Sequence, residues 1–348
     1  MRPARKLTAV VALGAAAVFA LAGCTKKNEE APAAGGASTG AASGQTYKVA
    51  FVPKLQGVPY FEAMNEGGKK AAAALGNVEW LYQGPTQADA AAQADIVRSY
   101  IQQKVNTLIV APNDPDSMAP LLQQAKDAGI HVATADTDAP SSVREAFVNQ
   151  ATAEGIGQGL TDSLLQAMGG QGKYAIVSCG QTAENLNSWI EVQKSYTASK
   201  YPNAQIVDIV YAGEDQAKAT QMATDLMNAH PDLTGLVGEC TSSAPGVAQA
   251  VQDANKVGQV FTVGLGTPQS MKPYLENGSS TAAILWDVQN LGYLTAWTGA
   301  QLAEGKPFAA TNDVSPDLSS IAYDESSKTL LLGPPLAITK DNVDQFNY

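Results

Sequence analysis

The sequence predicts an α/β fold in which two doubly wound parallel-sheet domains enclose a cleft. Short apolar runs rich in Val, Ile and Leu recur without polar alternation, as expected of parallel strands that are covered on both faces. Ala-rich segments with helical periodicity separate these runs. The chain has 348 residues, which is enough for two domains of ordinary size.

The composition is that of a globular protein with an acidic surface. Hydrophobic residues make up 45% of the chain and charged residues 16%. Lys and Arg number 22 and Asp and Glu 33, which gives a net charge of −11 and argues against a nucleic-acid partner. Two histidines and three cysteines offer few ligands for a transition metal, so we expect neither a metal site nor a cofactor.

Residues 1–23 are typical of a lipoprotein signal peptide. Three basic residues precede an apolar stretch at 7–21, which is too short for a comfortable membrane span. The stretch ends in LAGC, which resembles the bacterial lipobox and implies cleavage before Cys24 and lipid attachment to its sulfur. We therefore expect an extracytoplasmic protein anchored to the cell membrane. An ordinary signal peptide with an incidental cysteine is the alternative.

Residues 24–46 are predicted to be a flexible linker between the lipid anchor and the folded part. After Cys24 they contain no large apolar side chain and cannot contribute to a core. No later segment is long and apolar enough to predict a membrane span.

The alternating elements of the folded part follow in order. Nine apolar runs are predicted as strands, at 47–53, 78–84, 107–112, 131–136, 174–179, 205–211, 235–240, 260–266 and 281–287. Helical patterns lie between them, including 62–75, 88–103, 117–128, 217–229 and 245–255. Asp116 and Ser117 are candidates to cap the third of these helices, and Gly129 to close it.

Nine strands are too many for one small domain of this kind, and the chain divides near FVNQAT at 147–152. We expect an N-terminal domain of residues 47–149 plus about 288–314. The C-terminal domain would comprise residues 150–287 plus about 315–348. Open α/β sheets bind ligands at the carboxyl ends of their strands, so the candidate site lies there.

Charged, amide and aromatic side chains gather at these strand ends. The candidate ligand-binding residues are Lys54, Tyr60, Phe61, Asp136, Asn185, Trp189, Glu239, Trp286 and Asp287. A sugar requires this combination, because its hydroxyls need directional partners and its C–H faces lie well against aromatic rings. The structural alternatives are core packing for the aromatic residues, a turn cap for Asp136 and a solvated charge for Lys54.

The sequence shows no catalytic machinery, so we expect a binding protein and not an enzyme. No serine sits in a nucleophile elbow, and neither histidine has a cysteine or serine at a spacing typical of a catalytic pair. EGIGQG at 154–159 lacks the preceding strand and the third glycine of a dinucleotide fingerprint. An enzyme on the same scaffold is the competing class, because a fold does not fix a function.

Cys179 and Cys240 end the first and third strands of the second domain. These strands are neighbours in a flavodoxin-like order, and an oxidising compartment allows a disulfide between them. Adjacent parallel strands usually lack suitable geometry, so free thiols and a disulfide both stay open.

Eight segments stand in a characteristic order: VPKLQGVPYFEAMNEG, GPTQADAAAQ, APNDPDSMAP, ADTDAP, FVNQAT, GLGTPQSMKPYLENG, ILWDVQNLGYL and LLLGPPLAITKDNVDQFNY. Together they resemble the rhamnose-binding and autoinducer-2-binding branch of the type I periplasmic binding proteins, over about residues 48–348. The resemblance implies two α/β domains with a three-segment hinge that close on a ligand. It also implies delivery of a sugar to the permease of an ABC importer, and we expect a monomer.

The resemblance also bears on the site. Lys54 and Asp136 match polar ligand contacts of the autoinducer-2 branch, and Tyr60 and Phe61 match the aromatic pair that sandwiches the sugar in ribose binders.

The chain departs from that pattern at several positions. Asn185 and Leu186 stand where the autoinducer-2 binder has an acid and an amide, Glu239 and Thr241 replace its proline and alanine, and Gly266 replaces an aspartate of ribose binders. These departures imply a ligand whose hydroxyl groups are arranged differently from those of autoinducer-2 and ribose. We therefore expect a rhamnose-like sugar or a related polyol. A receptor for a signal molecule such as autoinducer-2 is the alternative.

Overall fold

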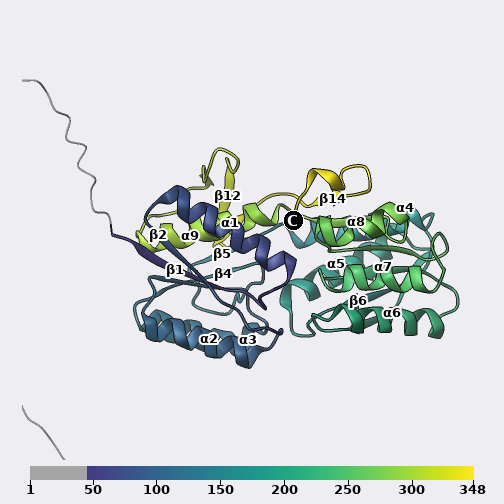
Figure 1. Cartoon of the computed structure of the whole chain (residues 1–348), viewed down its shortest axis with the longest axis horizontal. Coiled ribbons are helices and arrows are strands. Elements are labelled where there is room, and N and C mark those ends of the chain that lie inside the picture. Colours follow the sequence, from purple (N-terminus) through teal and green to yellow (C-terminus); the bar gives the residue numbers. More distant parts are fainter. Residues whose placement is uncertain (1–44) are drawn as a thin grey trace, which may run out of the picture. The chain divides into compact units, whose positions relative to one another are not determined.

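The computed structural model describes residues 45–348, which form one compact unit. The predicted signal peptide, Cys24 and nearly all of the predicted linker lie outside the described residues. Among the helices in this part of the chain, none is both long and apolar enough to span a bilayer. The unit has two lobes that lie side by side (Figure 1).

Within residues 45–348, the first lobe is built on an eight-stranded sheet. The strands in spatial order are β11 (Thr311–Asn312), β12 (Ile321–Asp324), β13 (Thr329–Leu331), β5 (Ala146–Asn149), β4 (His131–Ala135), β3 (Thr107–Val110), β1 (Tyr47–Val52) and β2 (Val78–Tyr82). The strands from β13 to β2 are parallel, whereas β11 and β12 form an antiparallel edge.

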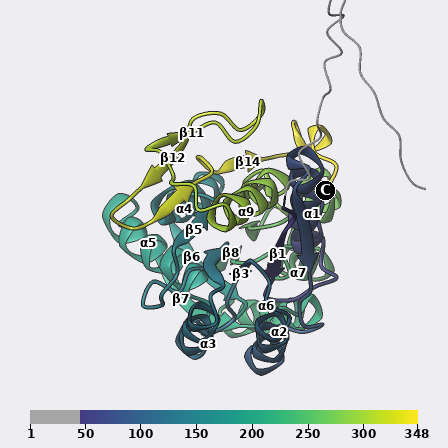
Figure 2. The same ribbon diagram turned by 90° about the vertical axis from the view of Figure 1, so that its left-hand side faces the viewer.

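Helices cover both faces of this sheet (Figure 2), which explains the continuous apolar runs of its strands. Val49 and Phe51 of β1 belong to the core beneath α1 (Pro59–Leu75) and α9 (Val288–Ala303). Ala50 and Val52 point the other way, into the core beneath α2 (Ala90–Gln103) and α3 (Pro115–Asp127). Helices α1 and α9 pack closely, since a Cβ atom at Gly292 would overlap the carbonyl oxygen of Met64.

The second lobe contains, in the described part of the chain, a six-stranded sheet. Its order is β14 (Leu336–Ile338), β10 (Ala282–Leu285), β9 (Phe261–Gly264), β8 (Leu233–Gly238), β6 (Gly172–Ser178) and β7 (Ala204–Tyr211), with β14 antiparallel and the others parallel. The helices are α4 (Ala153–Ala167), α5 (Glu184–Lys200), α6 (Gln216–Ala229), α7 (Ser243–Asp253) and α8 (Pro268–Asn277), followed by the short 3₁₀ helix η1 (Val343–Gln345).

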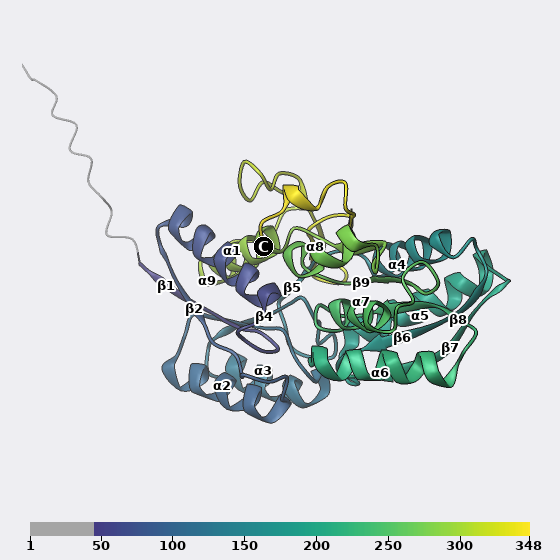
Figure 3. The same ribbon diagram turned by 45° about the vertical axis from the view of Figure 1, so that its right-hand side comes forward.

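In the described residues the chain crosses between the lobes three times: after β5, after β10 and between β13 and β14. Figure 3 shows the C-terminal segment, in yellow, lying over the region where the lobes meet. Two doubly wound sheets joined by three crossing segments confirm the predicted fold class.

The third crossing lies later than the expected position near residue 314. Strands β12 and β13 still belong to the first sheet, where β13 pairs in parallel with β5, and only β14 joins the second sheet. Arg144 also holds the turn before β13 in the first lobe, because its Nη1 atom donates to the Ser327 carbonyl oxygen over 3.0 Å.

The nine predicted strands are all present, and the helical patterns match α1, α2, α3, α6 and α7.

The predicted cap of α3 is wrong by a few residues. Asp114 is the N-cap, and its side chain accepts a hydrogen bond from the Ser117 backbone N–H over 2.9 Å. Pro115 can occupy the first helical position because no intrahelical bond is needed there. Gly129 follows the last turn with a φ of +80°.

Candidate ligand-binding site

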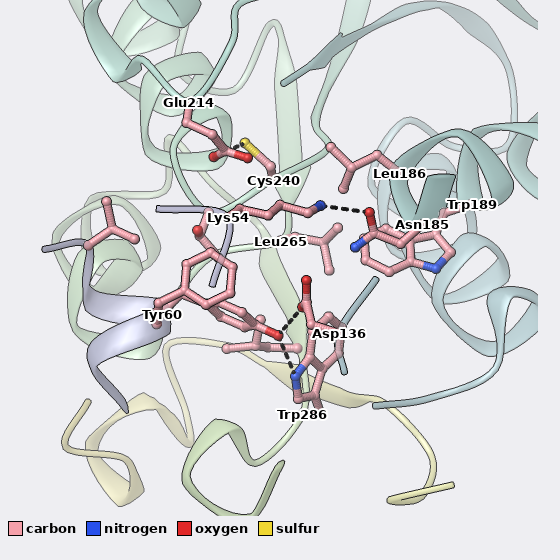
Figure 4. A pocket seen from close by; sticks show the side chains of 14 residues that line it. Lys54, Tyr60, Asp136, Asn185, Leu186, Trp189, Glu214, Cys240, Leu265 and Trp286 are labelled. Carbon is pink, nitrogen blue, oxygen red and sulfur yellow. Dashed lines mark hydrogen bonds between the residues drawn. The ribbon is translucent and has the colours of Figure 1, made fainter. Parts of the chain in front are cut away.

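A small pocket lies between the lobes, at the carboxyl ends of the strands of both sheets (Figure 4). The pocket is small, with a cavity volume of about 40 Å³. The lining residues are Lys54, Val58, Tyr60, Phe61, Asp136, Asn185, Leu186, Trp189, Glu214, Cys240, Thr241, Leu265, Leu285 and Trp286. Seven of the nine residues predicted at strand ends are thus brought to one place.

Lys54 joins the two lobes across this pocket. It follows β1 in the first lobe, and its side chain is buried with 4% of the residue exposed. Its Nζ atom donates to Oδ1 of Asn185, at the start of α5 in the second lobe, over 2.9 Å. Asn113 fixes the lysine backbone by donating to its carbonyl oxygen over 2.8 Å, and Thr182 of the second lobe donates to the Asn113 carbonyl over 3.0 Å.

Asp136 enters the pocket through an unusual backbone conformation. It directly follows β4 and has a φ of +67°, in the left-handed region that few residues other than glycine adopt. Its backbone N–H donates to the Val148 carbonyl oxygen over 3.1 Å, which holds this turn against β5. Aspartate tolerates the conformation better than most residues, and such positions are common at functional sites.

The aromatic residues form a cluster with its own hydrogen bonds. The hydroxyl of Tyr60 donates to Oδ1 of Asp136 over 2.6 Å, and Nε1 of Trp286 donates to the Tyr60 hydroxyl over 3.1 Å. The Tyr60 and Trp286 rings meet edge to face at 5.9 Å, and Trp189 and Phe61 extend the cluster. Burial, followed by the charge of Asp136, raises the pKa of Tyr60 well above its usual value, so its hydroxyl stays a donor.

Glu214 is a pocket residue that the sequence analysis missed. It follows β7, separated from the strand by Ala212 and Gly213. Its Oε2 atom accepts from the Ser242 hydroxyl over 3.2 Å. Burial raises the pKa of its carboxyl group, and the positive charge of Lys54 opposes this rise. The strand-end rule that selected Asp136 could have found it if the residues two or three beyond each apolar run had been included.

Cys179 and Cys240 form a disulfide, with 6.1 Å between their Cα atoms. From the sequence alone, both free thiols and a disulfide were possible for this pair. It joins the ends of β6 and β8, and Cys240 lines the pocket. The Glu214 carboxylate lies 3.5 Å from the Cys240 sulfur, so the pocket wall contains both groups side by side (Figure 4).

Two of the predicted residues, Glu239 and Asp287, do not line this pocket. Glu239 is fully buried away from it, and Nε2 of Gln193 on α5 contacts both its carboxylate oxygens at 2.8 and 2.7 Å. Successive residues point in opposite directions, so Cys240 faces the ligand side and Glu239 does not. Burial raises the pKa of Glu239 to about 8, although the hydrogen bonds from Gln193 act in the opposite direction and lower it.

Asp287 lies outside the pocket for a different reason. It is the N-cap of α9, and its Oδ1 atom accepts from the Asn290 backbone N–H over 2.9 Å. It lines a separate groove together with Tyr348.

This architecture is that of a bilobal binding protein, with a pocket between two α/β lobes. A family model described as the periplasmic binding protein domain matches residues 49–307. Because the match covers most of the chain, the protein belongs to the periplasmic binding protein family, as its sequence motifs predict.

The relatives include a D-ribose/D-allose-binding protein from Pseudomonas aeruginosa, 28% identical over 66% of this chain and 74% of its own. Among solved structures, LsrB from Clostridium saccharobutylicum in complex with AI-2 is 28% identical, with a TM-score of 0.81 over 86% of this chain and all of its own. A solute-binding protein from Clostridium phytofermentas with bound L-rhamnose is also 28% identical, with a TM-score of 0.81 over 87% of this chain and 98% of its own.

Proposed function

We propose that this protein captures a monosaccharide, a rhamnose-like sugar or a related polyol, and delivers it to the permease of an ABC importer. It catalyses no reaction in this proposal, acts as a monomer and is anchored to the extracytoplasmic side of a membrane through Cys24. The observation that carries the proposal is a pocket between two lobes in which carboxylates, a lysine and an amide face an aromatic cluster.

The polar groups match a molecule rich in hydroxyls. Asp136 and Glu214, when ionised, only accept hydrogen bonds, whereas Lys54 and the Nδ2 group of Asn185 donate them. A hydroxyl can do both, so a sugar or polyol can satisfy all of these groups at once. A ligand without several hydroxyls would leave a buried charge unpaired, which costs about 1–3 kcal/mol or more.

The apolar part of the pocket favours a ligand with a hydrocarbon face. Leu186, Leu265 and Leu285 line it together with the rings of Trp189 and Trp286. This wall suits the C–H groups of a sugar ring or the methyl group of a deoxy sugar. The relative with bound L-rhamnose supports this choice.

The mechanism follows from the placement of the pocket. A ligand held by Asp136 from the first lobe and Glu214 from the second stabilises the closed state more than the open state, and this difference in affinity drives closure. The three crossing segments would act as the hinge, and the lobes they join would be the two domains. The closed form would then dock on the permease.

A receptor for autoinducer-2 is the second candidate, because a structure of similar fold holds AI-2. The departures at Asn185 and Leu186 count against it. The same ligand screen separates the two candidates.

The test is a thermal-shift screen of the chain from Gln45 onward against monosaccharides, deoxy sugars, polyols and autoinducer-2. A ligand that binds only the folded state raises the melting temperature by an amount set by its concentration relative to its dissociation constant. We expect a shift with one sugar or polyol, abolished by Asp136→Ala. The absence of a shift with every sugar and polyol would overturn the sugar assignment, and a shift with autoinducer-2 alone would favour the signal receptor.

A further inference from the structure

We propose that Glu214 decides which arrangement of ligand hydroxyls the second lobe accepts, and that the Cys179–Cys240 disulfide positions its carboxylate. This inference deepens the proposed function and rests on it.

The segment after β7 continues alongside the end of the neighbouring strand β6. The backbone N–H of Ala212 donates to the Ser178 carbonyl oxygen over 2.8 Å, and that of Gly213 donates to the Cys179 carbonyl oxygen over 3.1 Å. Gly213 has a φ of +70°, a left-handed conformation that glycine adopts without strain and that turns the chain at this point. Glu214 comes next, beside the end of β6.

From there the Glu214 side chain reaches the end of β8, which is the strand on the far side of β6. Its partner is the hydroxyl of Ser242, and the sulfur of Cys240 lies 3.5 Å from its Oε2 atom. The disulfide therefore links the two strand ends between which Glu214 is held. Cys179 supports the loop through its carbonyl oxygen, and Cys240 forms part of the surface against which the carboxylate rests.

The carboxylate keeps most of its hydrogen-bonding capacity for a ligand. An ionised carboxylate offers about four acceptor positions. Among residues 45–348, the Ser242 hydroxyl occupies one of them, and a sulfur within a disulfide carries no hydrogen to donate. Glu214 also lines two neighbouring pockets, so it lies where three pockets meet.

This placement makes Glu214 the counterpart of Asp136, one carboxylate from each lobe. The Glu214 oxygens accept and never donate while they are ionised, so the ligand must direct an O–H group at them. An epimer or deoxy analogue that lacks this group leaves the carboxylate desolvated without a partner, and sites of this kind reject such analogues strongly. Glu214 is thus a specificity-determining residue.

The first experiment measures binding by calorimetry for the chain from Gln45 onward, which forms one compact unit. Wild type and Glu214→Gln are titrated with the sugar from the screen and with its single-position epimers and deoxy analogues. We expect Glu214→Gln to bind the best sugar about 10- to 100-fold more weakly, as for loss of a hydrogen bond to a charged group. The wild-type preference at one hydroxyl should disappear, which a merely structural effect would not cause.

The matched control is Glu191→Gln, an equal charge change on α5 of the same lobe, where the Glu191 side chain is 71% exposed. It should bind like wild type. If Glu214→Gln keeps both the affinity and the ranking of wild type, the assignment of Glu214 is overturned. If wild type binds no sugar, the proposed function itself fails, and the two failures are therefore distinguishable.

The second experiment tests the positioning role with a double-mutant cycle. The Cys179→Ser/Cys240→Ser pair is introduced into wild type and into Glu214→Gln. If the disulfide acts through Glu214, its removal weakens sugar binding in wild type and has less effect in the Glu214→Gln background. Equal losses of affinity in the two backgrounds would overturn the positioning role.

Discussion

Lys54 Nζ and Asn185 Oδ1 form a 2.9 Å hydrogen bond that runs directly from one lobe to the other. The same atoms belong to the pocket in which we place the ligand. Closure and ligand binding therefore share a donor, and the remaining N–H groups of the lysine can point at a ligand while one holds Asn185.

Replacing Lys54 by Met should weaken both functions of this lysine. We expect sugar affinity to fall by about 10-fold or more, because a charged donor is lost from a buried site. The radius of gyration of the unliganded protein, measured by small-angle X-ray scattering, should rise as the closed state loses a direct bond. Lys126→Met, at an exposed position near the end of α3, is the control and should change neither quantity.

Asp136 combines a ligand group with a left-handed backbone, and two substitutions separate these roles. Asp136→Asn keeps a residue that tolerates this conformation, so its stability should match wild type while its sugar affinity drops. Asp136→Ala should lose the affinity and also about 1–3 kcal/mol or more of stability, because alanine disfavours this backbone conformation and leaves the buried Tyr60 hydroxyl without its acceptor. Urea unfolding and calorimetry measure the two effects. Equal stability of the two variants would show that neither the backbone conformation nor the lost Tyr60 hydrogen bond costs alanine anything extra.

Reduction of the disulfide should destabilise the protein. The bond links residues 61 apart in sequence, and closing a loop of that size in the unfolded chain corresponds to about 4 kcal/mol in the chain-entropy model. Urea unfolding with and without a phosphine reductant should show a lower midpoint after reduction. The Cys179→Ser/Cys240→Ser variant should not respond to the reductant. An unchanged midpoint in wild type would contradict the stabilising role.

Glu239 should make stability fall as the pH rises. Burial raises its folded-state pKa to about 8, from an ordinary value of 4.5, so the folded protein retains a proton that the unfolded chain releases. Stability is then full below the unfolded pKa and declines through the interval up to the folded pKa, by about 1.4 kcal/mol for each pH unit.

The variant Glu239→Gln removes this titration and should flatten the profile. The free energy of unfolding can be measured with urea at several values between pH 5 and pH 9. As the pH rises, that of the variant should increase relative to that of wild type. Glu191→Gln, at an exposed position, is the control and should follow the wild-type profile. Parallel profiles for Glu239→Gln and wild type would mean that Glu239 is already ionised at the low end of this range.

Close packing of α1 against α9 should make Gly292 intolerant of a side chain. A Cβ atom there meets the Met64 carbonyl oxygen, and Gly292→Ala should cost about 1–3 kcal/mol or more in thermal or urea unfolding. Gly159→Ala is the matched control inside α4, where the nearest atom to a new Cβ is 3.5 Å away. It should be neutral, or stabilising by up to about 1 kcal/mol. Equal effects of the two substitutions would contradict the close contact.

The order of strands and helices could be read from the sequence because both sheet faces are covered. Each long strand then shows as an apolar run, such as the one around Val49 and Phe51. The short strand β12 carries no such run, and the leucine run at 330–332 does not reveal that β13 pairs with β5, which is far away in the sequence. The third crossing was therefore placed too early, since long-range pairing leaves little trace in a local pattern.

The site was predictable to the extent that strand ends define it. Lys54, Asp136 and Asn185 do meet at one pocket, as their positions suggested. The direction of a side chain after a strand was not predictable, because neighbours such as Glu239 and Cys240 face opposite ways and the register there depends on the turn. Glu214 was missed because it lies three residues beyond the end of β7, outside the apolar run that marks the strand.

The three crossings also bear on the order in which the protein can fold during synthesis. The first lobe includes α9 and β13, and the second lobe includes β14, so each sheet lacks a member until a late part of the chain has been made. Neither core can close while residues 288–338 are still inside the ribosome or its exit tunnel. The two lobes should therefore finish folding together once these segments have left the ribosome, in contrast to a chain of consecutive domains, in which the first domain finishes before the second begins.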